Sequence, residues 1–212
     1  MKIAIIGASG KEGKCLTEET VLRGHDVTAI VRDAQKVKMS DVKILEKDLF
    51  DLTYNDLKNF NVVIDAFGAW TPETLPLHQK SLNHLAGLLK NHEEIRLLVV
   101  GGAGSLYVDS DHKIRLMDTP EFPDAFVPLA TAMGIAFDDL KKTEGVNWTY
   151  LSPAADFAAD GERTGKYKLG GDEFIVNSAG NSQISYADYA IAMIDEAENG
   201  KFLKQRFSVV SE

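Results

Sequence analysis

Residues 2–13 read KIAIIGASGKEG, an apolar run followed by Gly7, Gly10 and Gly13. The run predicts a strand, and residues 11–23 have the apolar spacing of a helix. In such a turn the first glycine permits the tight bend, the second lets the main chain approach a diphosphate, and the third lets the helix pack on the strand. The N–H groups and the positive dipole end of the helix then face the phosphates. We therefore predict a dinucleotide site; the alternative is a glycine-rich turn without a ligand.

The first half of the chain alternates short β-branched runs with longer amphipathic stretches. Strands are expected at 3–6, 27–31, 42–45, 62–67 and 96–100, and helices at 11–23 and 76–92. Gly24 after Arg23 is a typical left-handed helix stop. Nearly continuous apolar strands that alternate with helices form parallel sheets covered on both faces. The prediction is an α/β fold with a doubly wound parallel sheet.

The second half is less regular. We expect a helix within 124–142, a strand at 147–151, a helix at 184–198 and a last strand at 206–210. Ser185 and Asp188 have the spacing of a capping box. Residues 153–172 are rich in glycine and charge, which predicts a loop or short hairpin on the surface. Binding groups in this fold class lie on loops at the carboxyl ends of strands, so substrate-side loops are expected mainly from 101–125 and 153–183.

Composition narrows the class of protein. The chain has 212 residues, 44% of them hydrophobic, and a formal net charge of −9. This length predicts one domain over residues 1–212, and no apolar run is long enough for a membrane span. The negative charge and the lack of a basic stripe argue against nucleic acid, and no secretory signal is visible, so we expect a cytoplasmic protein, either monomer or homodimer. Cys15 is the single cysteine, and the histidines show no metal-ligand spacing, so no disulfide and no metal are expected.

Several segments together resemble one family. The glycine spacing is G-x-x-G-x-x-G, and it is accompanied by GASGKEGKCLTEETVLRGHDVTAIVRD (7–33), KDLFD (47–51), VVGGAGSL (99–106), WTYLSPAADFAADGERTGKY (148–167) and ISYADYA (184–190). These segments resemble the extended and atypical short-chain dehydrogenase/reductase superfamily, in particular its small NmrA-like members and the NADH-flavin reductase group. The resemblance covers nearly the whole chain. It implies an NAD(P)-binding Rossmann fold and an oxidoreductase.

The end of the second strand distinguishes the two nicotinamide cofactors. An acidic side chain there binds the ribose hydroxyls, whereas a basic one can bind a 2′-phosphate. Arg32 occupies this position, which favours NADP over NAD; the alternative is a surface arginine paired with Asp33. The resemblance further implies that Asp48 and Leu49 border the adenine and that Ala66, Phe67 and Gly68 pass beneath the adenosine. The expected cofactor-binding residues are Gly7, Ser9, Gly10, Lys11, Glu12, Gly13, Arg32, Asp48, Leu49, Ala66, Phe67, Gly68, Gly102 and Pro153.

The catalytic pair of the superfamily is missing. Its usual Tyr-x-x-x-Lys motif occurs here only as Tyr54 and Lys58, which precede the fourth strand on the adenine side. The helix within 126–142, where the pair belongs, has no tyrosine. What remains is hydride transfer that needs little acid–base help, such as reduction of a flavin by NAD(P)H.

The loop after the fifth strand supplies the candidate catalytic residues Ser105 and Tyr107, both able to hydrogen-bond near the nicotinamide. Trp70, Ser105 and Arg163 are the candidate substrate-binding residues, although Trp70 could be a packed surface aromatic and Arg163 part of a solvated basic hairpin. The leading hypothesis is an NAD(P)H-dependent oxidoreductase that prefers NADPH and transfers hydride to a flavin (FMN or FAD), a quinone or a similar planar acceptor. The alternatives are an NADP(H)-binding redox sensor without turnover and a carbonyl reductase that uses Ser105 or Tyr107 as proton donor.

Overall fold

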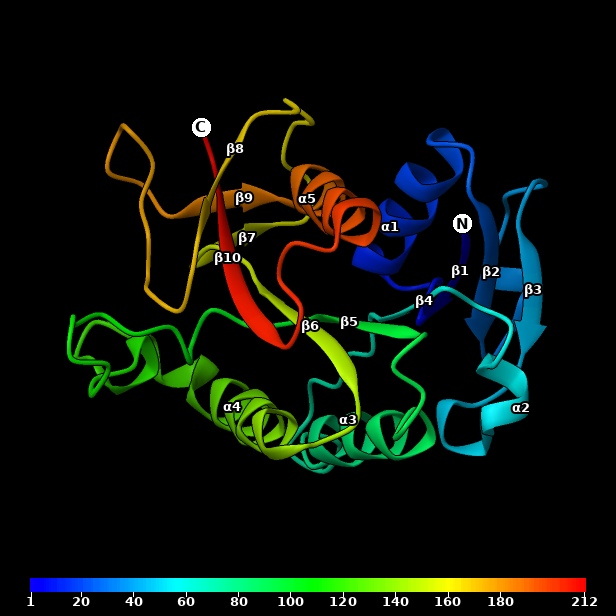
Figure 1. Cartoon of the computed structure of the whole chain (residues 1–212). Helices are drawn as coiled ribbons and strands as arrows, with labels where there is room; N and C mark the ends of the chain where they lie inside the picture. Colours follow the sequence, from blue (N-terminus) through cyan, green and yellow to red (C-terminus); the bar gives the residue numbers. More distant parts are fainter.

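Strands from both halves of the chain form one central sheet (Figure 1). The computed structural model describes residues 1–212. In spatial order the strands are β3 (Lys43–Glu46), β2 (Asp26–Val31), β1 (Lys2–Ile6), β4 (Val62–Asp65), β5 (Arg96–Val100), β6 (Asn147–Ser152), β10 (Gln205–Ser211) and β8 (Tyr167–Gly170). All are parallel to their neighbours except β8, which pairs antiparallel with β10 at the edge. The predicted doubly wound sheet is confirmed, with one antiparallel strand added.

Two layers of helices cover the sheet (Figure 1). Helices α1 (Lys11–Leu22) and α5 (Tyr186–Asn199) pack on one face, and α3 (Leu77–Leu88) and α4 (Val127–Lys142) on the other, with the short α2 (Tyr54–Leu57) beside them. Each face has its own buried cluster, which includes Leu16 and Tyr189 in the first and Leu85 and Phe137 in the second. Short 3₁₀ turns lie in the connections at Ala34–Lys36, Leu49–Asp51, Leu116–Asp118 and Asp124–Phe126.

The order of the strands reverses at β1. From β1 the chain passes outward to β2 and β3 on one side, and then returns to build β4, β5 and β6 on the other. The sheet thus has its switch point between β1 and β4, and open α/β sheets bind their ligands beside the carboxyl ends of the strands at such a point. The turn after β1 contains Gly7, Gly10 and Gly13.

The predicted elements of the first half are confirmed, and two of their ends shift by more than one residue. β4 ends at Asp65 rather than at residue 67, because the Asp65 carboxylate accepts a hydrogen bond from the Phe67 N–H at 3.0 Å and turns the chain. α3 ends at Leu88. The stop after α1 forms as predicted, with Gly24 at φ +75°. No helix of the protein combines the length and apolar character needed to span a membrane.

The hairpin predicted as one possibility within 153–172 is wrong. This segment contains two strands that do not pair with each other: β7 (Asp156–Ala158) pairs with β9 (Gln183–Ser185), and β8 pairs with β10. The partners lie much later in the chain, and the exposed short strands have no apolar period that would indicate them.

The predicted capping box at the start of α5 is half formed. The Ser185 hydroxyl accepts a hydrogen bond from the Asp188 N–H at 3.0 Å. The Asp188 carboxylate does not return to Ser185 but accepts hydrogen bonds from the Thr164 hydroxyl, at 2.6 Å, and from the Gly165 N–H, at 2.8 Å. Asp188 therefore fixes the 163–165 loop to the start of α5.

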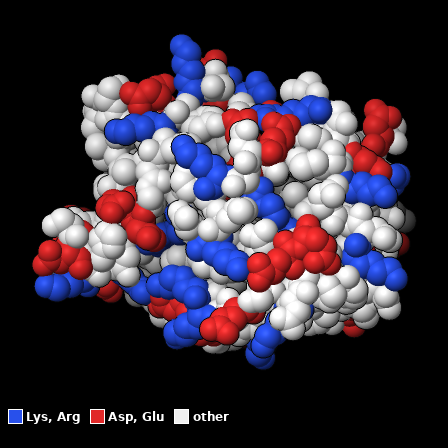
Figure 2. Space-filling view, in the orientation of Figure 1, with Lys and Arg blue, Asp and Glu red and all other residues white.

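Charged side chains are distributed over the surface without a dominant sign on the visible face. Figure 2 shows Lys and Arg interspersed with Asp and Glu over that face. On this face the acidic side chains are mixed with basic ones and do not gather in one acidic patch.

Candidate functional site

The turn after β1, residues 7–13, is built by close backbone contacts; we call it the glycine turn. Gly7 has a φ of +78°, and a Cβ at this position would lie 2.6 Å from the Ala66 carbonyl oxygen at the end of β4. A Cβ on Gly13 would overlap the Gly7 carbonyl oxygen. Only glycine satisfies both positions, because the start of α1 packs directly on the turn and the turn packs directly on the β4 loop.

The amino end of α1 is open. Its N-cap is Gly10, which has no side chain to cap the helix, and no other side chain does so. The first helical hydrogen bond is donated by the Lys14 N–H to the Gly10 carbonyl at 3.0 Å. The N–H groups of Lys11, Glu12 and Gly13 are left without helical partners and point out of the helix end. With Ser9 in the same turn, this geometry fits the diphosphate of a dinucleotide.

Arg32 lies at the carboxyl end of β2 with its side chain exposed. It forms no ion pair within the chain: Asp33 instead accepts a hydrogen bond from the Gln35 N–H at 3.0 Å, and its carboxylate lies 3.7 Å from Lys36 Nζ. The alternative reading of an Arg32–Asp33 pair does not hold, because Asp33 caps its own 3₁₀ turn. The guanidinium is free for an external anion.

The next predicted residues lie on the neighbouring loops. Asp48 accepts a hydrogen bond from the Phe50 N–H at 2.9 Å, and Leu49 is buried beside it. Ala66, Phe67 and Gly68 follow β4 and contact the glycine turn through Ala66. Trp70 follows them with 72% of its surface exposed. Asp48, Leu49 and the β4 loop thus belong to loops at the carboxyl edge of the sheet.

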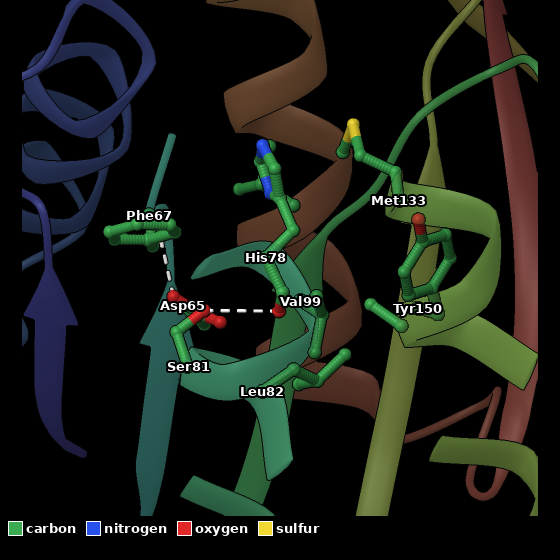
Figure 3. Close-up of a pocket in the computed structure, with 10 residues that line it drawn as sticks. Asp65, Phe67, His78, Ser81, Leu82, Val99, Met133 and Tyr150 are labelled. Atoms are coloured by element: carbon green, nitrogen blue, oxygen red, sulfur yellow. Dashed lines mark hydrogen bonds between the residues drawn. The ribbon is translucent and has the colours of Figure 1, made fainter. Parts of the chain in front are cut away.

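A small pocket lies between the ends of β4 and β5 and helices α3 and α4 (Figure 3). Its lining residues are Asp65, Phe67, His78, Ser81, Leu82, Val99, Val100, Met133, Ala136 and Tyr150. Its free volume of about 20 Å³ accommodates about one water molecule. A planar acceptor must therefore bind outside this pocket.

Three titratable groups line that pocket, and burial shifts the pKa of each. Burial raises the pKa of Asp65 to about 6, although the Phe67 N–H partly opposes the shift. Burial also raises the pKa of Tyr150 to about 12 and lowers that of His78. The Tyr150 hydroxyl accepts a hydrogen bond from the Gly102 N–H at 3.2 Å. Sequence reasoning missed Asp65 and Tyr150, because both read as ordinary residues of strands.

Ser105 is buried and held by an arginine from the far end of the chain. Arg206 on β10 donates hydrogen bonds from Nη1 to the Ser105 carbonyl, at 2.9 Å, and to its hydroxyl oxygen, at 3.0 Å. Arg206 also donates from Nε to Asp172 at 2.6 Å. Sequence reasoning missed Arg206, because nothing local in RFSVV indicates a partner 101 residues away. Tyr107 lies on the same loop and stacks on His112 with ring centroids 4.6 Å apart.

The α4 side chains nearest Gly102 and Gly104 are apolar, and Asp138 of α4 pairs with Arg115 farther along the loop. A Cβ on Gly102 would lie 3.1 Å from Met133 Sδ, and one on Gly104 would lie 2.6 Å from the Ala130 methyl. No tyrosine or lysine of α4 faces the loop. The distant Tyr54 stacks on His92, with centroids 3.8 Å apart, and Lys58 donates to Asn55.

Two further candidates lie after β6. Pro153 is buried directly beyond the strand. Arg163 donates to Glu19 at 2.8 Å, on the α1 surface two turns beyond the glycine turn. The structure thus does not bring Arg163 together with Trp70 and Ser105. No group of three or more His, Cys, Asp or Glu side chains is placed to hold a metal ion.

Comparison with known proteins agrees with this geometry. Residues 7–199 match the model of a family described as NAD(P)H-binding. The uncharacterised protein YwnB of Bacillus subtilis is 54% identical over 212 residues, which cover 100% of this chain and 99% of YwnB. The crystal structure of SP1627 from Streptococcus pneumoniae, described as a candidate NADH-flavin reductase, is 52% identical with a TM-score of 0.96 and covers 100% of both chains.

A second solved structure bears a different description. A Bacteroides thetaiotaomicron protein described as a candidate epimerase is 39% identical with a TM-score of 0.86, over 99% of this chain and 96% of that one. Both solved structures share the fold of this chain, whereas the chemistry described for them differs.

Proposed function

Because the chain belongs to the NAD(P)H-binding family, we propose that it is an oxidoreductase that prefers NADPH and reduces a flavin, a quinone or a similar planar acceptor. One contrast in the site carries the proposal. The cofactor end has a complete set of free N–H groups at the start of α1. The substrate end has the apolar Met133 and Ala130 on α4, the helix on which the resemblance places the catalytic pair of the superfamily.

The reaction that fits this contrast is hydride transfer with a proton taken from water. The reduced nicotinamide, when bound, supplies the hydride. The chain's part is to hold the reactants in line, which can lower a barrier by roughly 7–11 kcal/mol without a protein acid. Tyr150 is a poor proton donor here, because its pKa is raised to about 12 and its hydroxyl lies inside the fold.

Aromatic surfaces favour a planar acceptor. Trp70 exposes 72% of its surface next to Gly68, where a Cβ would come within 3.3 Å of its indole nitrogen. An exposed indole beside the β4 loop offers a face for stacking a flavin or quinone ring, and such aromatic contacts contribute about 0.5–1.5 kcal/mol beyond the buried area. Ser105 is buried and already accepts a hydrogen bond from Arg206, so we assign it to holding the loop.

Activity is tested by following NADPH absorbance with the purified protein and FMN, FAD, riboflavin or a quinone, with NADH in parallel. The expected result is steady oxidation above the rate without protein, and a higher kcat/KM with NADPH. Tight cofactor binding without turnover of any acceptor would contradict the enzyme hypothesis and favour the second candidate.

That second candidate is a redox sensor that binds NADP(H) without turnover. The observation in its favour is that α4 carries no tyrosine to act as a proton donor. A sensor needs the cofactor site but no acceptor site.

The preference for NADPH is tested by Arg32→Glu. Loss of a charge-assisted contact to the 2′-phosphate should raise the Kd for NADPH about 10- to 100-fold, with a change of less than about threefold for NADH. Lys36→Glu is the matched control, since Lys36 is an exposed cation on the same loop that pairs with Asp33. Equal losses for both cofactors would remove Arg32 from the 2′-phosphate role.

A further inference from the structure

Arg206, the arginine that contacts Ser105, is closed to an external anion. Its side chain is only 1% exposed, and its Nε donates to the Asp172 carboxylate at 2.6 Å. Nη1 donates to the Ser105 carbonyl and hydroxyl oxygens, and Nη2 donates to the Asp172 carbonyl at 3.0 Å. The carboxylate partner cancels the positive charge at short range, and burial keeps a phosphate away from the guanidinium. Arg206 therefore builds this side of the site without offering it a free charge.

Arg115 is the second cation near Ser105, and it is paired as well. A Cβ on Gly134 of α4 would lie 3.6 Å from Arg115 Nη1 and 3.9 Å from Ser105 Cβ, so the two side chains lie against the same point of that helix. Arg115 donates from Nη2 to both carboxylate oxygens of Asp138, at 2.9 Å each. The two side chains are 22% and 31% exposed, so this pair lies at the surface of the fold and not in its core.

The remaining cations of the substrate-side loops are Lys113, Arg163, Lys166 and Lys168. Lys113 and Arg163 pair with acids at 3.0 Å and 2.8 Å. Lys166 and Lys168 lie beside or on the edge strand β8, which β6 and β10 separate from β5. Neighbouring strands are about 4.8 Å apart, so the backbone of these lysines lies about 14 Å or more from the loop after β5. None of the four supplies a free positive charge beside Ser105.

The substrate-side loops as a whole are acidic. Residues 101–125 and 153–183 contain ten Asp and Glu residues against five Lys and Arg residues, a local charge of −5 in a chain of net charge −9. The cofactor side differs, because Arg32 at the end of β2 is exposed and unpaired. The charges of the chain thus favour an anion at the 2′-phosphate position and disfavour one at the acceptor position.

We infer that the acceptor is an uncharged ring compound, riboflavin or a quinone, and that the phosphate-bearing flavins FMN and FAD are disfavoured. This inference narrows the acceptor class of the proposed function and rests on it. A phosphate monoester such as that of FMN carries a charge of about −1.5 to −2 at pH 7, and no free cation beside Ser105 compensates it. Stacking on an exposed aromatic such as Trp70 needs only the ring.

The test compares kcat/KM for riboflavin, FMN, FAD and menadione at saturating NADPH, while the ionic strength is raised from about 0.01 M to about 1 M. The Debye length falls from about 30 Å to about 3 Å over this range, so the salt screens the acidic loops. At low salt riboflavin should exceed FMN by about tenfold or more, and the ratio should fall toward one at high salt. The values for riboflavin and menadione should change by less than about twofold. Equal values for riboflavin and FMN at low salt, or a preference for FMN, overturn the inference.

Asp138→Asn gives an independent measurement, because it removes the charge that neutralises Arg115 and keeps an amide oxygen in place. With that guanidinium free, kcat/KM for FMN should rise about three- to tenfold, and the value for riboflavin should change by less than about twofold. Asp139→Asn is the matched control, since Asp139 on the same helix accepts hydrogen bonds from Gln79 and Asn83 of α3; it should leave both values unchanged. Circular dichroism verifies that the variants are folded. An unchanged value for FMN in Asp138→Asn also overturns the inference.

Binding without turnover separates this inference from the proposed function. Quenching of flavin fluorescence gives the Kd for riboflavin and for FMN in the presence of NADP, whether or not hydride is transferred. Tighter binding of riboflavin, with a ratio that shrinks in salt, supports the inference when turnover is absent and contradicts only the reductase. Turnover without a preference for the uncharged acceptors supports the reductase and contradicts the inference. If neither flavin binds and menadione is not reduced, both fail.

Discussion

Gly13 lies where α1 comes closest to the chain before it. A methyl group there would overlap the Gly7 carbonyl, which belongs to backbone that is itself packed on the β4 loop. Gly13→Ala should therefore lower the free energy of unfolding by about 3 kcal/mol or more and abolish NADPH binding. Urea denaturation and cofactor fluorescence measure the two effects.

Gly87→Ala is the matched control for this prediction. Gly87 is an exposed residue of α3, and a Cβ there would meet nothing within 4 Å. Alanine should be neutral or stabilise by up to about 1 kcal/mol, through its better helix propensity. Normal cofactor binding by Gly13→Ala would show that the close packing of the glycine turn is not needed for the site.

Asp65 predicts a pH dependence of stability. Burial raises its pKa to about 6 in the folded protein, against about 3.9 for an unfolded chain. Its contribution is thus fully present below about pH 4 and is lost as the pH rises through about 6, a change of roughly 3 kcal/mol. Asp65→Asn keeps an acceptor for the Phe67 N–H and should remove this part of the pH dependence. Melting temperatures from pH 4 to about pH 8 for both proteins measure it; parallel curves would contradict the assignment.

An arginine of the last strand, β10, holds the loop after β5. Arg206 on β10 satisfies the buried Ser105 carbonyl and hydroxyl, and its guanidinium lies 4.8 Å from the centre of the Phe137 ring. Arg206→Met should lower the free energy of unfolding by about 2–4 kcal/mol, because the Ser105 carbonyl is left without its donor. Lys204→Met, which removes only an exposed pair with Glu93, should change it by less than about 0.5 kcal/mol. Similar losses in the two variants would show that the contacts of Arg206 contribute no more to the free energy of unfolding than an exposed ion pair does.

The elements that sequence predicted are those whose signals are local. The apolar run before Gly7 and the helix that ends at Gly24 are specified by residues next to them, and so is the glycine turn. β7 and β8 were not predicted as separate strands, because their partners β9 and β10 lie far along the chain. The Arg206–Ser105 contact is equally non-local. Glu12 was predicted as a cofactor-binding residue, but an acid in a first helical turn is ordinarily a dipole partner; its burial, with neither carboxyl oxygen hydrogen-bonded, is visible only after α5 packs over it.

One apolar core joins the two ends of the chain. The cluster beneath α1 and α5 includes Ile3 and Ile5 of β1 together with Phe207, Val209 and Val210 of β10. Arg23 at the end of α1 also binds Asp195 and Glu198 of α5. These contacts leave no point at which the chain could be divided into two parts with separate cores, which supports the proposal of one domain over residues 1–212.

We therefore expect the whole molecule to unfold in one cooperative transition. Trp148 is buried on β6, so its fluorescence reports on the packing around this strand. The exposed Trp70 would obscure the fluorescence of Trp148, so the measurement uses the variant Trp70→Phe. Urea unfolding of this variant, followed by Trp148 fluorescence and by far-ultraviolet circular dichroism, should give coincident midpoints and equal slopes, as two-state unfolding requires. Saturating NADPH should move both midpoints together, since a ligand that binds only the folded chain stabilises all parts that fold with its site. A fluorescence midpoint that stayed fixed while the circular dichroism midpoint moved would show that the sheet divides near β6 and that the cofactor stabilises only part of it.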